Sequence, residues 1–431
     1  MKTQRVLTGI TTSGTPHLGN YVGSVRPSVR MSLQAHAQSF YFLADYHALI
    51  KTGDPARVQR STLEIAATWL ACGLDPEKVT FYRQSDIPEI PELTWFLTCM
   101  TGKGLLNRAH AYKASVDKNT ATGEDPDSGV NAGLFMYPVL MAADILMFNA
   151  HAVPVGRDQI QHIEMARDIA SSFNHQYGEH FTLPEAFIDD NVALLPGLDG
   201  RKMSKSYDNT IPLFVPREQL RKLIMGTVTD SRAPGEPKST EGSAVFQLYQ
   251  AFASAEETAA FGQQFQEGIA WGDAKTQLFE RVDQEIAPMR ALYTGLMQDP
   301  AHIERTLKKG AEKARAVATP FTTRLRHAVG LRPLDHAAAA PTGGPAEKSA
   351  LPSFKQYRES DGCFHFKMLD ARGQLLLQSK GFASPKDAGL AIARLRSEGP
   401  QALPELQSQL LFQGDEAPLV AALAELQGAS G

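Results

Sequence analysis

The chain has 431 residues, of which 43% are hydrophobic and 21% are charged, and its formal net charge is −4 at pH 7. These values are ordinary for a soluble globular protein of about two to four domains, and they argue against a protein that coats nucleic acid non-specifically. The three cysteines (Cys72, Cys99 and Cys363) are far apart and odd in number, which argues against a disulfide framework and favours a reducing cytoplasm. No signal peptide or membrane span is predicted.

Strand and helix patterns alternate along the first half of the chain. Short apolar runs predict strands, and apolar residues at helical spacing predict helices. The predicted strands are 6–10, 39–44, 79–82 and 152–155, and the predicted helices are 55–73, 136–148 and a segment from residue 158 onward. This alternation predicts an α/β fold, a Rossmann-like doubly wound parallel sheet, over residues 1–214. The polar segment 116–131 is expected to be a surface loop.

The second half of the chain changes character twice. Amphipathic helical patterns predict an all-α domain at 215–335, and the Ala-, Pro- and Gly-rich segment 336–353 predicts a linker. A small α+β domain is expected at 354–398, with strands at 364–369 and 374–379 and a helix that begins at Pro385 after the cap Ser384. Residues 399–431 are interpreted as a C-terminal tail.

The first motif with chemical potential directly follows the first predicted strand, in the run Ser13-Gly14-Thr15-Pro16-His17-Leu18-Gly19-Asn20. A strand, a glycine-containing turn and a helix start form a geometry that binds phosphate on backbone N–H groups. Gly19 would allow close approach of the adenine ring or ribose, while His17 and Asn20 would donate hydrogen bonds to phosphoryl oxygens. An ordinary turn with Asn20 as a helix cap fits the same run equally well.

The second motif is Lys202-Met203-Ser204-Lys205-Ser206. Two lysines three residues apart, separated by small or flexible residues, predict a cationic loop that can close on a polyphosphate as charge develops on it. Taken alone, the motif also fits a solvated surface turn.

Together the two motifs resemble the signature motifs of class I aminoacyl-tRNA synthetases, commonly written HIGH and KMSKS. Asn20 departs from the last His of the first motif, and the tryptophan and tyrosine subgroup tolerates that change. Further runs at 137–146 and 153–162, with shorter matches at 19–23, 45–47, 229–231 and 310–314, extend the resemblance. Over about residues 1–332 the chain resembles the bacterial tryptophanyl-tRNA synthetase family.

That resemblance implies a two-step reaction. Tryptophan is activated with ATP to tryptophanyl-adenylate and pyrophosphate, and the tryptophan is then transferred to the 3′-terminal adenosine of tRNA(Trp). The resemblance implies four catalytic residues: His17, Asn20, Lys202 and Lys205. It implies that ATP is bound by Thr11, Thr12, Ser13, Gly19, Asn20, Gly156, Asp158, Lys202, Met203, Ser204 and Lys205. Asp158 also fits a helix N-cap.

The spacing of Tyr137, Met141 and Asp144 places the three side chains on one helix face. An apolar surface with one carboxylate suits an indole, because Asp144 can accept its single N–H and Met141 can form an adaptable apolar wall. The resemblance implies that tryptophan is bound by Leu7, His47, Tyr137, Met141, Asp144, Val153, Val155 and Gln159. Packing in a core explains Tyr137, Met141 and His47 equally simply.

The resemblance also implies Mg²⁺ carried on the ATP phosphates, no tightly bound metal, and a homodimer with Trp95 either at its interface or in the core. An iron–sulfur cluster held by four cysteines after the second motif is excluded, since only Cys363 follows Lys205. A basic stretch (Lys308, Lys309, Lys313 and Arg315) suits either phosphate contacts or a solvated helix face.

Three other functions fit parts of the sequence. A tyrosyl-tRNA synthetase is disfavoured by Met141, where those enzymes usually carry Gln. A nucleotidyltransferase of the same fold lacks the lysine motif and the helical domain. A non-charging paralogue that binds tryptophan or RNA would be signalled by loss of His17, Lys202 or Lys205, and all three are present. The region from Phe354 onward resembles the YegP-like family of small bacterial domains, which implies no particular role.

Overall fold

The computed structural model describes residues 4–12, 14–33, 37–50, 52–188, 195–332, 351–359, 362–370, 374–411 and 416–429. The chain forms two compact units, Met1–Arg332 and Pro333–Gly431. The first unit therefore contains both the expected catalytic region and the expected helical region. In the part of the chain that the structure describes, no helix is both long and apolar enough to cross a membrane.

A five-stranded parallel sheet forms the centre of the first unit, in the strand order β3-β2-β1-β4-β5. The strands are β1 (Gln4–Thr11), β2 (Ala37–Ala44), β3 (Thr80–Arg83), β4 (Ala152–Pro154) and β5 (Glu185–Phe187). The predicted α/β class and Rossmann-like arrangement are confirmed. β5 was not predicted, because its three residues carry little apolar signal.

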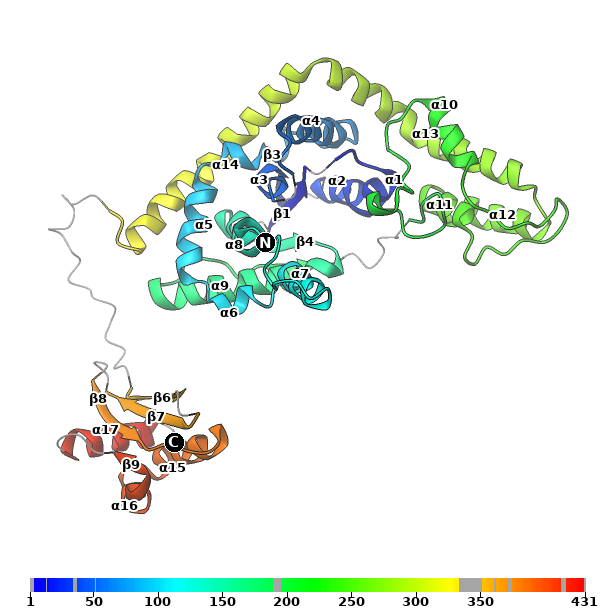
Figure 1. The fold of residues 1–431 in the computed structure, drawn as a ribbon. Helices are drawn as coiled ribbons and strands as arrows, with labels where there is room; N and C mark the ends of the chain where they lie inside the picture. The colour runs from blue at the N-terminus through cyan, green and yellow to red at the C-terminus, as the bar shows by residue number, and fades with distance from the viewer. Residues whose placement is uncertain are drawn as a thin grey trace. The chain divides into compact units, whose positions relative to one another are not determined.

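Side chains on β2 alternate between two hydrophobic cores, one on each face of the sheet. Phe40 and Phe42 belong to one core, whereas Tyr41 and Leu43 belong to the other. This alternation explains why the strand is apolar throughout, as strands buried on both faces are. Figure 1 shows α4 (Pro55–Ala71) on one side of the sheet, with α8 (Ala132–Met147) and α9 (Ile160–Tyr177) on the other.

The other helical elements of the first unit surround this centre or extend from it. They are α1 (Leu18–Asn20), η1 (Tyr21–Val25), α2 (Arg26–Ser32), α3 (Asp45–Ala48), η2 (Gln84–Asp86), α5 (Glu89–Met100), α6 (Lys103–Leu106), α7 (His110–Ala121), η3 (Arg157–Gln159), η4 (Lys205–Tyr207), α10 (Arg217–Met225), α11 (Ala244–Phe252), α12 (Ala255–Gln266), α13 (Trp271–Gln298) and α14 (Pro300–Ala328). Figure 1 shows α10 to α13 at one end of the unit, from which α14 returns along the sheet.

The prediction of a loop at 116–131 was wrong for its first part. Helix α7 continues to Ala121, and only the residues after it form turns. Asn119 is the one buried side chain of this helix, and its amide donates to the carbonyl oxygens of Pro126 and Ser128 at 3.0 and 2.8 Å. The helix therefore has almost no apolar periodicity, and the signal on which the sequence prediction depended is missing.

Helix α14 packs on β3 with almost no space between the two backbones. A Cβ atom added to Gly310 would lie 1.6 Å from the carbonyl oxygen of Phe81. We therefore expect Gly310→Ala to lower the free energy of unfolding by about 3 kcal/mol or more, because backbone must move. Gly295→Ala is the matched control, since Gly295 lies in α13 with nothing within 4 Å of an added Cβ. In denaturant unfolding, Gly295→Ala should raise the free energy of unfolding by up to about 1 kcal/mol. Equal changes in the two variants would contradict the close packing of α14 on β3.

The second unit has a four-stranded antiparallel sheet, in the order β6-β7-β8-β9. The strands are β6 (Ser353–Arg358), β7 (Phe364–Leu369), β8 (Leu375–Ser379) and β9 (Leu410–Leu411). Helix α15 (Pro385–Glu398) begins at the predicted cap, where the Ser384 side chain accepts from the Asp387 N–H. The linker predicted at 336–353 lies outside the described residues up to 350.

The interpretation of 399–431 as a tail needs correction. This segment contains η6 (Gly399–Ala402), α16 (Leu403–Leu406), η7 (Gln407–Gln409), β9 and α17 (Glu416–Ala429). Leu406, Leu419 and Leu423 are buried in one core with Phe366 of β7. The segment thus completes the small domain. It looked like a tail because its elements are short and bury their apolar side chains only against distant parts of the chain.

Candidate active site

The candidate site lies where the strand order reverses, between β1 and β4. Open parallel sheets bind ligands at the carboxyl ends of the strands beside such a switch point. β1 leads to the first motif and β4 leads to Gly156, which caps η3. β2 leads to His47 in α3, and β3 leads to Gln84 in η2. The topology therefore collects four loops at one edge of the sheet, and three of them carry predicted residues.

His17 is the N-cap of α1 and forms a reciprocal pair with Asn20. The His17 Nδ1 atom accepts from the Asn20 backbone N–H at 3.3 Å, and the Asn20 Oδ1 atom accepts from the His17 backbone N–H at 3.1 Å. Asn20 thus takes part in capping the helix, as the second member of a capping box whose N-cap is His17. Because Nδ1 accepts, the proton of a neutral His17 ring is on Nε2, which can donate to an anion.

His17 is expected to be neutral when the cavity is empty. Burial, followed by the positive charge of Lys205, lowers its pKa from the ordinary 6.5 to about 4. A histidine with a lowered folded-state pKa contributes stability above pH 6.5, and this contribution is lost as the pH falls toward 4. The histidine NMR signals should titrate near pH 4 and move to higher pH when ATP adds negative charge nearby. A midpoint of about 6.5 without ATP would contradict this environment.

Asn209 organises the loop that carries the lysine motif. Its side chain is buried, accepts from the Ser204 N–H at 2.8 Å, and donates to Asp199 at 2.6 Å and to the Lys202 carbonyl at 3.1 Å. Met203 is buried as well, and its sulfur accepts from the Gly19 N–H at 3.4 Å. The two motifs are thus in direct contact. Sequence reasoning missed Asn209, since an Asn three residues beyond the motif resembles any turn residue.

A cavity of about 590 Å³ lies between the first motif, the lysine loop and α4. It is lined by Gly14, Thr15, His17, Asp54, Ala56, Arg57, Arg60, Ser61, Glu64, Lys205, Thr210 and Pro212. Arg57, Arg60 and Lys205 bring three cations to one space, which suits a polyphosphate. Partial desolvation, followed by the charge of Arg57, lowers the pKa of Lys205. Lys202 is exposed and is not part of this lining.

The α4 side of this cavity was not predicted. The Ser61 hydroxyl accepts from the Gly14 N–H at 2.7 Å, and Glu64 accepts from the Thr15 hydroxyl at 2.8 Å and from Arg60 at 2.9 Å. These bonds hold the turn of the first motif against α4. In the sequence, Arg57 and Arg60 resemble any solvated helix positions, so only the tertiary structure identifies them.

Asp144 is buried in α8, with three hydrogen bonds to its carboxylate. The Gln84 side-chain amide donates to both oxygens at 2.8 and 2.9 Å, and His47 Nε2 lies 3.0 Å from Oδ2. Burial raises the pKa of Asp144, and the hydrogen bond and charge of His47 oppose that rise. A carboxylate has about four acceptor positions, so one more donor can be accommodated. The acid predicted to need a partner thus has two, of which Gln84 was missed.

Tyr137 and Gln159, predicted to act on the same ligand, are joined through His162. The amide oxygen of Gln159 can only accept, so its 3.0 Å contact places a proton on His162 Nδ1. Nε2 then accepts from the Tyr137 hydroxyl at 2.7 Å. His47 meets the Tyr137 ring edge-on at 6.3 Å between centroids. Tyr137, His47 and Asp144 therefore surround one region of the site.

The remaining predicted residues fall into three sets: four apolar residues, Thr12, and those outside the described part of the chain. Leu7, Met141, Val153 and Val155 belong to or pack against the core that contains α8, and Met141 and Val155 are only partly buried. The Thr12 hydroxyl is buried and has no hydrogen-bond partner among the described residues. Ser13 and the side chains of Thr11 and Asp158 lie outside the described part of the chain.

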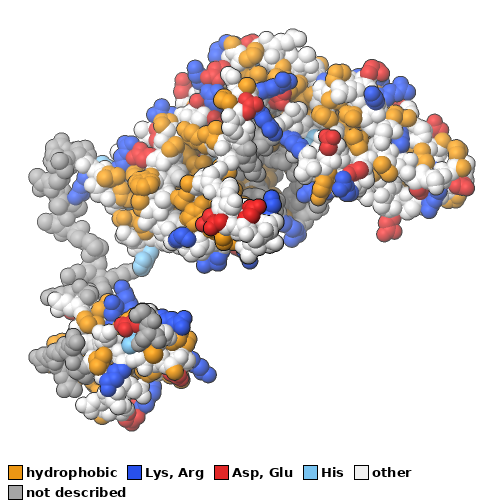
Figure 2. Space-filling view, in the orientation of Figure 1, with side chains coloured by type: hydrophobic (Ala, Val, Ile, Leu, Met, Phe, Trp, Pro, Cys, Tyr) orange, Lys and Arg blue, Asp and Glu red, His pale blue; other side chains and the backbone are white. Residues whose placement is uncertain are grey.

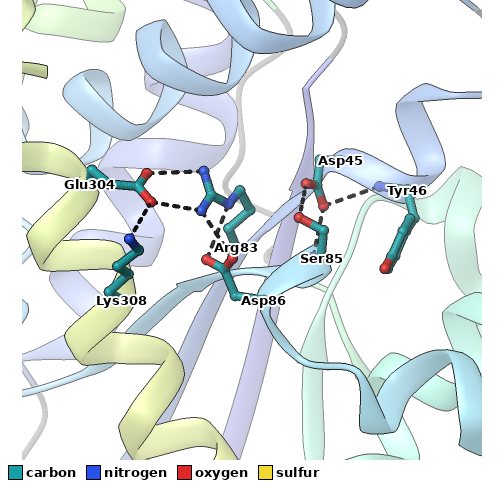
Figure 3. Close-up of polar contacts among 7 residues, drawn as sticks. All are labelled: Asp45, Tyr46, Arg83, Ser85, Asp86, Glu304 and Lys308. Atoms are coloured by element: carbon teal, nitrogen blue, oxygen red, sulfur yellow. Dashed lines mark hydrogen bonds and ion pairs between the residues drawn. The ribbon is translucent and has the colours of Figure 1, made fainter. Parts of the chain in front are cut away.

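Two polar clusters flank Gln84 in the sequence, and the one that contains Arg83 joins β3 to α14 (Figure 3). Arg83 donates to Asp86 at 2.9 Å and to both oxygens of Glu304 in α14 at 3.1 Å. On the other side of Gln84, the Ser85 backbone N–H and hydroxyl both donate to Asp45. The Gln84 amide oxygen in turn accepts from the Tyr46 N–H at 3.1 Å. The oxygen of the Gln84 amide is therefore held by Tyr46, which directs the amide nitrogen toward Asp144.

Comparison with known proteins agrees with this geometry. The family model described as tRNA synthetases class I (W and Y) matches residues 1–286. The chain is 70% identical to the tryptophan–tRNA ligase of Xanthomonas axonopodis pv. citri, over 91% of this chain and 92% of that protein. It is 61% identical to the tryptophan–tRNA ligase of Pseudomonas aeruginosa, over 91% and 88%. The crystal structure of Campylobacter jejuni tryptophanyl-tRNA synthetase complexed with ADP and tryptophan superimposes with a TM-score of 0.70, at 42% identity, and covers 76% of this chain and 100% of that one.

The Rossmann-like sheet, the two motifs in contact and the family match define a class I tRNA synthetase, and the chain belongs to the tryptophan and tyrosine family of that class. Within the family its activity is that of a tryptophan–tRNA ligase. The alternatives of a tyrosine enzyme, a nucleotidyltransferase and a non-charging paralogue are therefore set aside.

Proposed function

We propose that the indole of tryptophan is recognised at Asp144. The observation that carries this proposal is the carboxylate's buried position, where Gln84 and His47 hold it with an acceptor position to spare. Met141, Val153 and Val155 offer apolar surface for the ring, and Tyr137 and Gln159 hold the ammonium and carboxylate groups. A phenol is disfavoured, since its hydroxyl meets no polar group at Met141, and phenylalanine is disfavoured because it leaves Asp144 without a donor.

The triphosphate of ATP binds in the cavity lined by His17 and Lys205. Support comes from its cations, from the neutral His17 with its proton on Nε2, and from the glycine turn at Gly14. Gly156 and Asp158 face the ribose and adenine. Arg57, Arg60, Lys205 and His17 would hold the phosphates, and Mg²⁺ carried with the ATP would neutralise part of the phosphate charge.

In the first step a tryptophan carboxylate oxygen attacks the α-phosphorus, and the bond to the pyrophosphate oxygen breaks. No general base is needed, because the nucleophile is already ionised. Catalysis consists of alignment and charge stabilisation, and Lys202 and Lys205 neutralise the leaving pyrophosphate as the loop closes. In the second step the 2′-hydroxyl of the terminal adenosine of tRNA(Trp) attacks the acyl carbon and AMP leaves.

The helical region 215–335 recognises the anticodon in this proposal. The basic stretch predicted in α14 is a poor candidate for phosphate contacts. Lys309 pairs with Glu77 at 2.7 Å, Lys313 donates to the Pro76 carbonyl at 2.7 Å, and Lys308 and Arg315 pair with Glu304 and Glu89 at 3.5 and 3.1 Å. Lys309, Lys313 and Arg315 thus hold α14 against the sheet domain, whereas Lys308 pairs within α14. The odd, isolated cysteines support a cytoplasmic location.

Measurement of ATP–pyrophosphate exchange with tryptophan and with tyrosine tests the proposed specificity. Exchange should depend on tryptophan, and tyrosine should be activated at least about 10⁴-fold less efficiently because it leaves buried polar groups unpaired. Comparable values of kcat/KM for the two amino acids would overturn the assignment of Asp144 and Met141.

The enzyme is proposed to be a homodimer, and Trp95 is the candidate contact. Trp95 lies on α5 with 66% of its surface exposed, so the alternative of core burial is wrong. We expect Trp95→Glu to shift the particle to monomer mass in sedimentation analysis, because a charge replaces a large apolar side chain at the interface. Leu292→Glu, at a 60% exposed position of α13, is the matched control and should leave the mass unchanged. If both variants keep the mass of the parent protein, Trp95 does not lie at a dimer interface.

A further inference from the structure

The sheet of the second unit has two unlike faces. Phe366, Met368 and Leu377 form one face and are buried in the core with side chains of α15 and α17, which lie on that side of the sheet (Figure 1). Strand alternation places a different set on the opposite, outer face. This set is Lys355 and Tyr357 of β6, His365 and Lys367 of β7, and Gln378 of β8, and it is named here the outer face.

Tyr357 of the edge strand β6 is held in a fixed orientation on the outer face. Its ring stacks on His365, directly opposite on β7, with 5.6 Å between centroids and an interplanar angle of 20°. The Gln378 amide donates to the Tyr357 hydroxyl at 2.7 Å, and the Lys367 ammonium lies 5.8 Å from the ring centroid. A partly exposed ring fixed in this way, next to a cation, is a surface on which a nucleobase can stack.

The two lysines of the outer face are placed where their like charges lower the stability of the unit. Lys355 and Lys367 occupy directly opposite positions of β6 and β7, where two like charges repel. Neither forms an ion pair with an acid in the described ranges of the unit. Glu359 lies 3.9 Å from His365 of this face. An anion placed between the two ammonium groups would relieve their repulsion.

We propose that the outer face binds the tRNA that this enzyme charges, with Lys355 and Lys367 on backbone phosphates and Tyr357 against an unpaired base. Polyanion charge and exposed bases are the two features that this face complements, and tRNA is the substrate of the enzyme that has both. The surface would add affinity for tRNA without taking part in amino acid activation, because the first unit contains all the residues assigned to that step.

The experiment uses the full-length chain with Lys355→Ala and Lys367→Ala combined, and separately with Tyr357→Leu. Lys386→Ala is the matched control, since it removes an exposed lysine of the same unit from α15, on the other side of the sheet. Two reactions are compared: ATP–pyrophosphate exchange, which needs no tRNA, and aminoacylation at varied tRNA concentration. Affinity for tRNA is also measured between about 50 and 200 mM salt.

In the double lysine variant, the KM for tRNA should rise roughly tenfold with kcat little changed, and exchange should match the parent. The slope of log Kd against log salt should fall by about 1.5, as expected for two lost phosphate contacts. Tyr357→Leu should weaken tRNA binding about fivefold and leave the salt slope unchanged, because stacking is not ionic. The control should resemble the parent in every measurement.

Other outcomes would overturn the proposal. Unchanged tRNA binding in both variants, with an unchanged melting temperature, would show that the face does not contact tRNA. A change of sedimentation mass would indicate that it contacts a second copy of the chain instead. An equal loss of tRNA affinity in Lys386→Ala would show that the effect comes from the net charge of the unit and not from the outer face. Each outcome is separable from failure of the enzyme, because exchange activity reports the first unit alone.

Discussion

Lys205→Ala is expected to slow tryptophanyl-adenylate formation by about 10² to 10³, the usual cost of removing one preorganised donor to developing charge. The Lys205 ammonium lies beside Gly14 and His17 in the cavity proposed for the triphosphate, whereas Arg57 and Arg60 reach the same cavity from α4. Affinity for tryptophan should stay near the parent value, because Asp144 and its partners Gln84 and His47 are separate from the lysine loop.

Pre-steady-state exchange rates measure the first quantity, and equilibrium dialysis with labelled tryptophan measures the second. Lys222→Ala is the matched control, an exposed lysine on α10 of the same unit. It should leave both values unchanged. A Lys205→Ala enzyme that exchanges at the parent rate would remove this residue from the chemistry, and a parallel loss of tryptophan affinity would indicate a structural role instead.

Asp144→Asn is expected to raise the KM for tryptophan by about 10- to 100-fold, because a charged acceptor of the indole N–H becomes a neutral amide. The new side chain keeps its size, but its NH₂ group would face donors of Gln84 or His47. Part of the loss will therefore appear as reduced stability. The KM for ATP should change little, since the cavity that holds the phosphates does not include Asp144.

Steady-state exchange at varied tryptophan and varied ATP separates these effects, and a thermal unfolding curve measures the stability change. Asp168→Asn serves as the control, because Asp168 is exposed on α9 and should be silent. A KM for tryptophan within about twofold of the parent would show that Asp144 is only a structural acid.

Local sequence was sufficient for most of the sheet, for a specific reason. β1 to β4 are apolar runs separated by turn residues, and α4, α8 and α9 carry apolar stripes, so burial and periodicity agree. Prediction failed where that agreement is absent. Helix α7 buries only Asn119, and the segment 399–431 buries its leucines against strands far away in sequence. Neither α7 nor the segment 399–431 therefore shows a periodic apolar pattern from which a helix or strand could be predicted.

The same distinction holds in the site. His17, Asn20, Lys202 and Lys205 stand in short motifs whose residue types already indicate phosphate chemistry, and Asp144 is conspicuous because an acid in an apolar helix needs a partner. Gln84, Arg57 and Asn209 carry no such signal. Each is an ordinary polar residue until the fold places it beside Asp144, the phosphate cavity or the lysine loop.

The sequence by itself therefore determined the class of fold, and it picked out the two motifs proposed for ATP and the acid proposed for the indole, because these depend on residue types and on spacings of a few residues. Only the tertiary structure decided what holds them in place: Gln84 and His47 around Asp144, Asn209 under the lysine loop, and the return of α14 along β3 at Gly310. The contacts of Asp144 and of Gly310 join residues 60 or more positions apart, and no local pattern encodes such a distance; Asn209 lies near its partners in sequence but looks like any turn residue. The outer face of the second unit belongs to the same category, since strand register alone brings Lys355 opposite Lys367.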